Sequence, residues 1–147
     1  MKYILTLLAF LMSAPAYSHE DHTTDALEFS SAWARETMGR TMSAAAYVTI
    51  KNIGSQSDTI TGVSSDAAAM VQLHRSYEED GVMRMQHTPE LDIKAGETAT
   101  LKPGSYHIML MRLTSPLAVG DVFTVTVSFK HAGDIKLPVE VTTMAGK

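Results

Sequence analysis

Residues 122–129, VFTVTVSF, alternate strictly between apolar and polar side chains. Successive side chains of a strand point to opposite faces, so this pattern predicts a strand with one face in the core. The same alternation over 135–141 (IKLPVEV) predicts a second strand of the same kind. Pro138 falls on the polar face of that second strand and indicates a place at an edge of the sheet.

Short strands are predicted along the rest of the chain from about residue 27 onward. They cover 44–50, 58–63, 68–76, 82–87, 97–101 and 106–113. No stretch shows the sustained periodicity of a helix, and no internal repeat or linker divides the chain. Many short strands at regular spacing predict an all-β fold, an antiparallel Greek-key β-sandwich.

The first 18 residues have the three parts of a secretory signal peptide. Lys2 supplies the positive charge, 4–12 (ILTLLAFLM) the apolar run, and 16–18 (AYS) the small residues before a cleavage point. The apolar run is too short for a membrane span, which needs about 20 residues in a helix. We therefore expect a periplasmic mature protein that is not inserted in a membrane. The predicted organisation is a signal peptide over 1–18, a flexible N-terminal tail over 19–26 and one domain over 27–147.

The composition excludes several kinds of chemistry. The chain has no cysteine, which excludes thiolate catalysis, cysteine-held zinc and an electron-transfer copper site with a cysteine ligand. A net charge of −4 without a basic run is unfavourable for a nucleic-acid partner. The chain has ten methionines and six histidines, and these residue types are ligands for soft metal ions.

Two of these residues share one face of a predicted buried strand. His107 and Met109 lie two positions apart within 106–113, so their side chains point the same way. Their Cα atoms are then about 6.5 Å apart, which is close enough to share one metal ion.

His74 and Met85 lie on the two arms of a predicted hairpin. A four-residue loop over 78–81 would place them directly opposite each other, about 4.5–5.5 Å apart at Cβ. A tighter two-residue turn at 80–81 would instead pair His74 with His87. The sequence leaves both registers open.

Two imidazoles and two thioethers form a neutral, soft set of ligands. Thioether sulfur selects Cu(I) and binds hard cations poorly, whereas imidazole also accepts Zn(II) and Ni(II). The prediction is therefore one Cu(I), no catalytic residue, and a carrier of copper instead of an enzyme. The predicted ligands are His74, Met85, His107 and Met109.

The other methionines and histidines are expected to pack or to face solvent. They include Met38, Met42, Met70, Met83, Met111, His87 and His131. His19 and His22 form a small cluster in the predicted tail and are candidates for a weaker, separate Cu(II) site.

The four predicted ligands are spaced H-x10-M-x21-H-x-M, and this spacing resembles the motif of the PCu(A)C periplasmic copper chaperones. The segments 32–35 (AWAR), 80–85 (DGVMRM) and 103–111 (PGSYHIMLM) resemble that family too. The resemblance covers about 32–141 and implies a cupredoxin-like β-sandwich with Cu(I) at these four positions. It also implies delivery of copper towards the copper A centre of cytochrome c oxidase, to an oxidase subunit or to another copper chaperone. Arg75 stands where many members have methionine.

Two alternatives are open at this point. A copper-dependent oxidative enzyme would use His19 as an N-terminal ligand, and hydrogen peroxide production by the copper-loaded protein would reveal it. A β-sandwich interaction module would bind no metal, and elemental analysis of the purified protein would separate it from a copper carrier.

Overall fold

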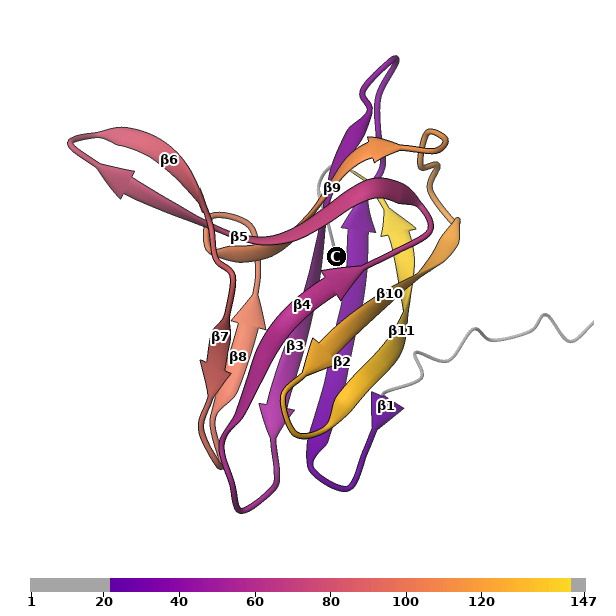
Figure 1. Ribbon diagram of the computed structural model, residues 1–147. Coiled ribbons are helices and arrows are strands. Elements are labelled where there is room, and N and C mark those ends of the chain that lie inside the picture. The colour runs from indigo at the N-terminus through magenta and orange to yellow at the C-terminus, as the bar shows by residue number, and fades with distance from the viewer. Residues whose placement is uncertain (1–21, 144–147) are drawn as a thin grey trace, which may run out of the picture.

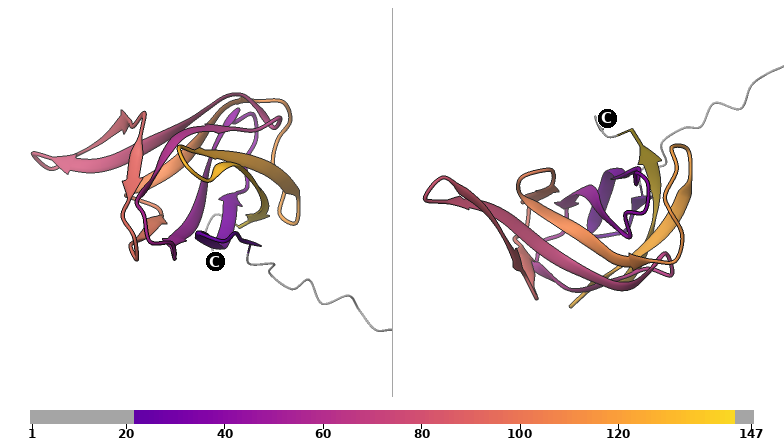
Figure 2. Two further views of the ribbon diagram at one scale, coloured as in Figure 1. Left: turned by 60° about the horizontal axis from the view of Figure 1, so that its bottom comes forward. Right: turned by 90° about the horizontal axis from the view of Figure 1, so that it is seen from above.

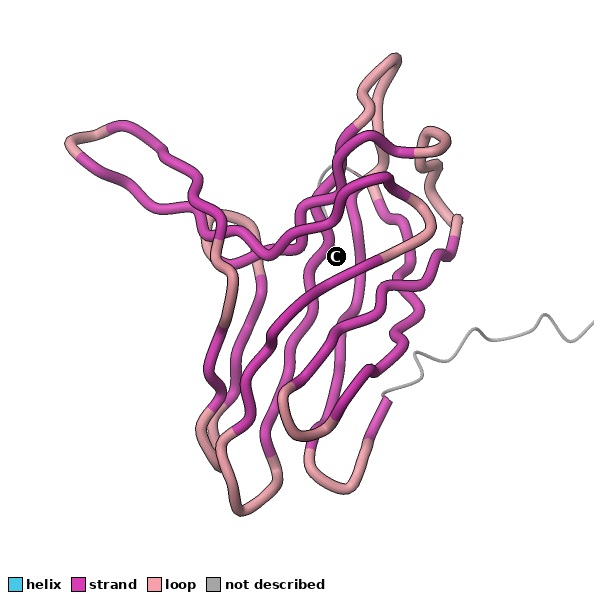
Figure 3. Tube along the Cα trace, viewed as in Figure 1, coloured by secondary structure: helices cyan, strands magenta, loops and turns pink. Residues whose placement is uncertain are grey.

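The computed structural model describes residues 22–143, and its regular structure is entirely β (Figure 3). The predicted signal peptide and His19 lie outside these residues. Across 22–143 there is no helix with the length and apolar character that a membrane crossing requires. The strands are β1 (His22–Thr23), β2 (Leu27–Arg35), β3 (Ser43–Asn52), β4 (Asp58–Ser64), β5 (Ala68–Glu79), β6 (Val82–His87), β7 (Leu91–Ile93), β8 (Thr98–Leu101), β9 (Tyr106–Leu113), β10 (Val122–Phe129) and β11 (Gly133–Thr142).

The strands form one curled sheet in the order β6-β5-β9-β3-β2-β11-β10-β4-β7, with β1 beside β2 and β8 beside β3. The predicted all-β class is confirmed. The expectation of purely antiparallel pairing is wrong for one pair, because β11 runs parallel to β2 from Glu140 to Thr142 (Figure 1). Alternation within a strand fixes which face is buried but not which strand lies beside it. The pairing of the first long strand with the last is therefore not visible in local patterns.

The predicted edge position of the strand that contains Pro138 is also wrong. β11 lies inside the sheet, between β10 and β2. Pro138 nevertheless lies at a position where the strand has a hydrogen-bonded neighbour on one side only within residues 22–143. It faces Thr124 of β10, whereas the pairing with β2 begins only at Glu140. The strand has one described neighbour at this point, so a residue without an N–H is tolerated there.

The sheet closes around a single apolar core (Figure 2). Phe29 of β2 and Phe129 of β10 are separated by β11 in the strand order, yet their rings meet edge to face with centroids 5.9 Å apart. The alternation that predicted β10 is confirmed, since Val125 and Val127 are fully buried. Each such side chain contributes about 1.5–3 kcal/mol through burial.

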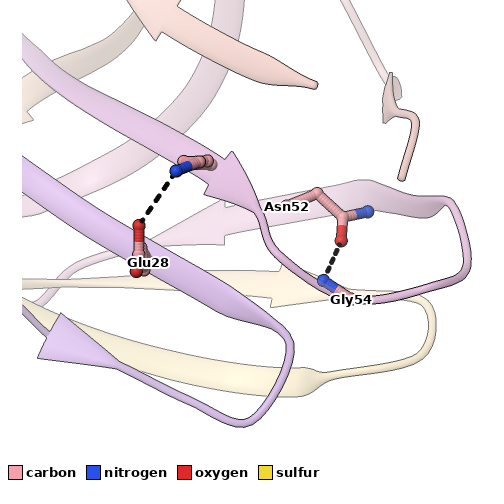
Figure 4. A network of polar contacts seen from close by, with 4 residues as sticks. Glu28, Asn52 and Gly54 are labelled. Carbon is pink, nitrogen blue, oxygen red and sulfur yellow. Dashed lines mark hydrogen bonds and ion pairs between the residues drawn. The ribbon is translucent and has the colours of Figure 1, made fainter. Parts of the chain in front are cut away.

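A buried asparagine fastens the end of β3 that is far from the β5–β6 hairpin. The Asn52 amide nitrogen donates to the carbonyl oxygens of Gln56 and Ile93 at 2.8 and 3.0 Å. Its side-chain oxygen accepts a hydrogen bond from the Gly54 N–H at 3.0 Å, as Figure 4 shows. A buried polar group costs little when its hydrogen bonds are made, so this network holds the loop after β3 against β7.

Part of the predicted tail pairs with the domain. His22 faces Phe29 and Thr23 faces Glu28 in the short β1–β2 ladder. The Thr24 hydroxyl accepts a hydrogen bond from the Leu27 N–H at 3.0 Å and supports the turn between them. His22 and Thr23 therefore pair with β2 and residues 24–26 form the turn into it, where the sequence predicted a flexible segment.

The β5–β6 hairpin settles the register that the sequence left open. Glu79 faces Val82, so the turn consists of Asp80 and Gly81 alone. Their φ angles are 52° and 76°, the positive values of a type I′ turn, for which Asp-Gly is a favoured pair. The four-residue loop is therefore wrong and the tighter turn is right. The hairpin projects from the body of the sheet, and every residue of β6 is exposed (Figure 1).

Candidate metal centre

Three histidines lie side by side on three neighbouring strands. His74 of β5 faces His87 of β6 on one side and His107 of β9 on the other. The ring centroids are 5.9 Å apart in both pairs. An imidazole nitrogen lies about 2 Å from a bound metal, so two rings that share an ion have centroids within about 6 Å of each other. Each pair therefore has the spacing of two ligands to one ion.

Met109 lies on the same face as His107, as the strand geometry predicts. It faces Gln72 of β5 on one side and Ala45 of β3 on the other. Ala45 has a small side chain, which leaves room around the thioether. The two buried residues that flank Met109 in β9, Ile108 and Leu110, fill the core on the opposite face. The structure thus brings His74, His107 and Met109 together.

Met85 is placed differently from the other three predicted ligands. It faces Ser76 and not His74, because the two-residue turn shifts β6 by two residues relative to β5, compared with the four-residue loop. Ser76 is two residues beyond His74, so Met85 shares the face of His74 as its diagonal neighbour. Diagonal neighbours lie about 7–8 Å apart, within reach of a long side chain. Met85 is 55% exposed and lies on the other side of His74 from Met109.

Hydrogen bonds of the two inner histidines determine which ring nitrogens are available to a metal. The Nδ1 atom of His107 is 3.1 Å from the Ser105 carbonyl oxygen, which can only accept, so this nitrogen donates. The Nε2 atom of His74 likewise donates to the Gln72 side-chain oxygen at 3.1 Å. The remaining nitrogen of each neutral ring therefore carries a free electron pair. In His74 that nitrogen, Nδ1, is buried without a hydrogen-bond partner, an arrangement that suits a metal ligand.

The surroundings of His74 favour its neutral form. Burial lowers the pKa of His74 below the ordinary value of 6.5, and the neighbouring His107 and His87 lower it further. Only a neutral imidazole can bind a metal. The ring is therefore ready to bind at neutral pH.

No group of three or more histidine, aspartate or glutamate side chains within residues 22–143 is arranged to hold a metal ion. The cluster around His74 instead combines imidazoles with thioethers. Soft ions such as Cu(I) suit this donor set, and hard cations do not.

Two methionines that were expected to pack in the core lie on the face of the candidate site. Met70 on β5 faces Met111 on β9. This pair lies two residues along the strands from the pair of Gln72 and Met109 and on the same face. Met70 is 40% exposed. The face that carries the histidine row is therefore rich in methionine beyond the predicted ligands.

His87 was expected to pack or to face solvent, yet it belongs to this cluster. It is exposed, as expected, but it also extends the histidine row. A signal for it exists in the sequence, since Met85-x-His87 repeats in reverse order the spacing of His107-x-Met109. Only the register of the hairpin shows that both pairs lie on the same face.

Comparisons with known proteins place the chain in a family. A family model described as "Putative lipoprotein LpqE-like" matches residues 27–141. The chain belongs to this LpqE-like family. A relative from Leifsonia xyli subsp. xyli, "Putative lipoprotein Lxx21020", is 36% identical over 123 residues, which cover 83% of this chain and 73% of that protein.

Two solved structures similar to this family member contain copper. The copper-bound PCuAC domain from PmoF2 superposes with a TM-score of 0.72 at 19% identity, over 84% of this chain and 98% of that domain. The Cu(I) form of DR1885 from Deinococcus radiodurans gives a TM-score of 0.61 at 26% identity, over 78% of this chain and 77% of that protein. The resemblance to PCu(A)C proteins and the cupredoxin-like fold class are thereby confirmed.

Proposed function

We propose that this protein is an exported copper chaperone of the periplasm, which holds one Cu(I) ion as cargo and passes it to another protein. The proposed ligands are His74, His107 and Met109, with Met85 reaching in from the hairpin as the fourth. The observation that carries this proposal is the pairing of the His74 and His107 rings at 5.9 Å, each with one nitrogen free for a metal. The similarity to copper-bound PCuAC domains supports it.

The properties of the ligands suit a carrier. Thioethers and neutral imidazoles bind Cu(I) without releasing a proton from sulfur, and thioethers form no disulfides in an oxidising compartment. Met85 is exposed on the side of the hairpin, which leaves the ion open to exchange there, and Met109 is half-buried on the other side of His74. We propose the copper A centre of cytochrome c oxidase as the destination, reached through an oxidase subunit or another copper chaperone.

The test is an anaerobic titration of the apo protein with Cu(I) in the presence of a competing chromophoric chelator. We expect a single tight Cu(I) site per chain and little competition from Zn(II), since thioethers discriminate against harder ions. A protein that leaves all copper on a weak chelator would contradict the proposal and would favour a metal-free interaction module.

Replacing either methionine ligand by leucine is expected to weaken Cu(I) binding while keeping the shape of the side chain. For Met109→Leu and Met85→Leu we expect the Cu(I) dissociation constant to rise about tenfold or more, because a soft sulfur donor is lost. Met83→Leu, on the same exposed strand, is the matched control and should change the constant little. X-ray absorption should show sulfur scatterers at the copper, and a spectrum with nitrogen and oxygen ligands alone would refute the assignment.

A further inference from the structure

The histidine row continues past the proposed copper site to the edge of the sheet. His107 is 4% exposed, His74 is half-buried and His87 is exposed on β6, the last strand on this side of the sheet. The same 5.9 Å separates the His74 ring from either neighbour. The His74 ring therefore has a second imidazole at the same distance, on the exposed side of the row.

On each side of His74 the neighbouring strand carries one histidine and one methionine, two residues apart. His107 and Met109 lie two apart on one face of β9, and His87 and Met85 lie two apart on one face of β6. Both faces are the face of His74, because paired residues of neighbouring strands point the same way. His74 is thus flanked by a buried imidazole–thioether pair and by an exposed one.

The hairpin keeps its arginines, Arg75 and Arg84, on the face opposite these donors. Arg84 forms an ion pair with Glu79, and both lie on the face opposite His74. Glu78, which faces Met83, is an acidic residue on the His74 face. Met83 and Met85 occupy the His74 face and are 60% and 55% exposed. The exposed surface beside His87 consequently offers soft donors without a cation beside them.

We propose that His87 is an exit ligand, which with His74 and Met85 forms a second, outer position for the same Cu(I) ion. This inference rests on the proposed function and adds a route by which the ion leaves. In the step outward, the bonds from copper to His107 and Met109 break and a bond to His87 forms, while His74 stays bound. The ion remains Cu(I) throughout, and no proton moves because every ligand is neutral.

The His74 side chain can serve both positions. The χ2 torsion of histidine is broad and roughly two-fold, so a turn of the ring directs its unpaired nitrogen towards either neighbour. A shared ligand also means that only one position is filled at a time. The stoichiometry therefore stays at one copper per chain, and the outer position is detected by kinetics and not by a second equivalent of metal.

The test compares His87→Gln with His131→Gln, which removes an exposed histidine from the turn between β10 and β11. Each Cu(I)-loaded protein is mixed with bathocuproine disulfonate in a stopped-flow instrument, and the second-order transfer constant is measured. For His87→Gln we expect the equilibrium dissociation constant to stay within about threefold of wild type while the transfer constant falls about tenfold, a change of about 1.4 kcal/mol in the barrier. His131→Gln should leave both constants unchanged.

A second background makes the test independent of the transfer reaction. In Met109→Leu the inner position is weakened, so the outer position should hold a larger share of the copper. Adding His87→Gln there should weaken Cu(I) binding about tenfold, far more than in wild type, which is the non-additivity expected of coupled ligands.

Two results would overturn the inference. A transfer constant within threefold of wild type in His87→Gln would place His87 outside the route. An affinity loss of tenfold or more from His87→Gln alone would make His87 a ligand of the resident site, with no separate outer position. Either result leaves copper binding intact, whereas failure of the proposed function itself would appear as a wild-type protein that binds no Cu(I).

Discussion

Below about pH 6 the Cu(I) affinity of this protein is expected to fall steeply, approaching a hundredfold for each pH unit, and above about pH 7 it should be nearly flat. Protons compete with the metal for the imidazole ligands of the proposed site, whereas thioethers do not titrate in water. Two titrating ligands give a limiting slope of two decades per unit. The measurement is the Cu(I) dissociation constant between pH 5 and pH 8 by chelator competition.

The direction of the pKa shift of His74 refines this expectation. Burial, followed by the neighbouring His107 and His87, lowers the pKa of His74 below 6.5, so proton competition at this ring sets in only at more acidic pH. The same shift acts on stability. As the pH falls below about 6.5 the unfolded chain takes up this proton before the folded protein does, and the apo protein loses stability until the lowered pKa is passed.

The variant His74→Met isolates the contribution of one histidine. It should reduce the limiting slope to about one decade per pH unit, because a single titrating ligand remains. It should also favour Cu(I) over Cu(II), since a third thioether softens the site. His131→Gln should keep the wild-type slope. If His74→Met also kept that slope, His74 would not be a copper ligand.

Replacing Leu110 by alanine is expected to lower the free energy of unfolding of the apo protein by about 2–5 kcal/mol. Leu110 is fully buried on the core face of β9, between the positions of Met109 and Met111 on the opposite face. The loss combines the transfer energy of the removed atoms with the cavity they leave. Chemical denaturation followed by circular dichroism measures it.

The control and the copper dependence separate packing from ligand loss. Val122→Ala, at a residue that is 61% exposed, should change the free energy of unfolding by no more than about 0.5 kcal/mol. Cu(I) should stabilise the Leu110→Ala protein as it stabilises wild type, because binding to the folded state alone shifts the equilibrium. A loss below about 1 kcal/mol would mean that the core relaxes around the gap.

Most of the strands could be predicted because their alternation is strong. The interval 122–129 and the interval 106–113 coincide with β10 and β9. The parallel pairing of β11 with β2 could not be predicted, since it joins segments at the two ends of the domain and leaves no local pattern. Local alternation also gave no reason to expect a second neighbour for β11.

The candidate site could be predicted in part. The same-face position of His107 and Met109 follows from the strand period alone, whereas the choice of His74 and Met85 depended on the family spacing and on an open register. The register follows from two backbone angles at Asp80 and Gly81, which the sequence permits but does not impose. His87 joined the histidine row only once that register was fixed.

The type I′ turn also limits how this segment can change in length. If the turn kept two residues, one residue added to or removed from β6 next to it would shift the register and send every following side chain of β6 to the other face, so that Met85 and His87 would both be lost to the site. The number of residues between His74 and Met85, ten, is therefore fixed by the hairpin backbone as well as by the ligands. Natural variants of the hairpin should differ by substitution and not by insertion or deletion. Such substitutions should be most frequent at Glu79 and Arg84, because their exposed ion pair contributes little to stability.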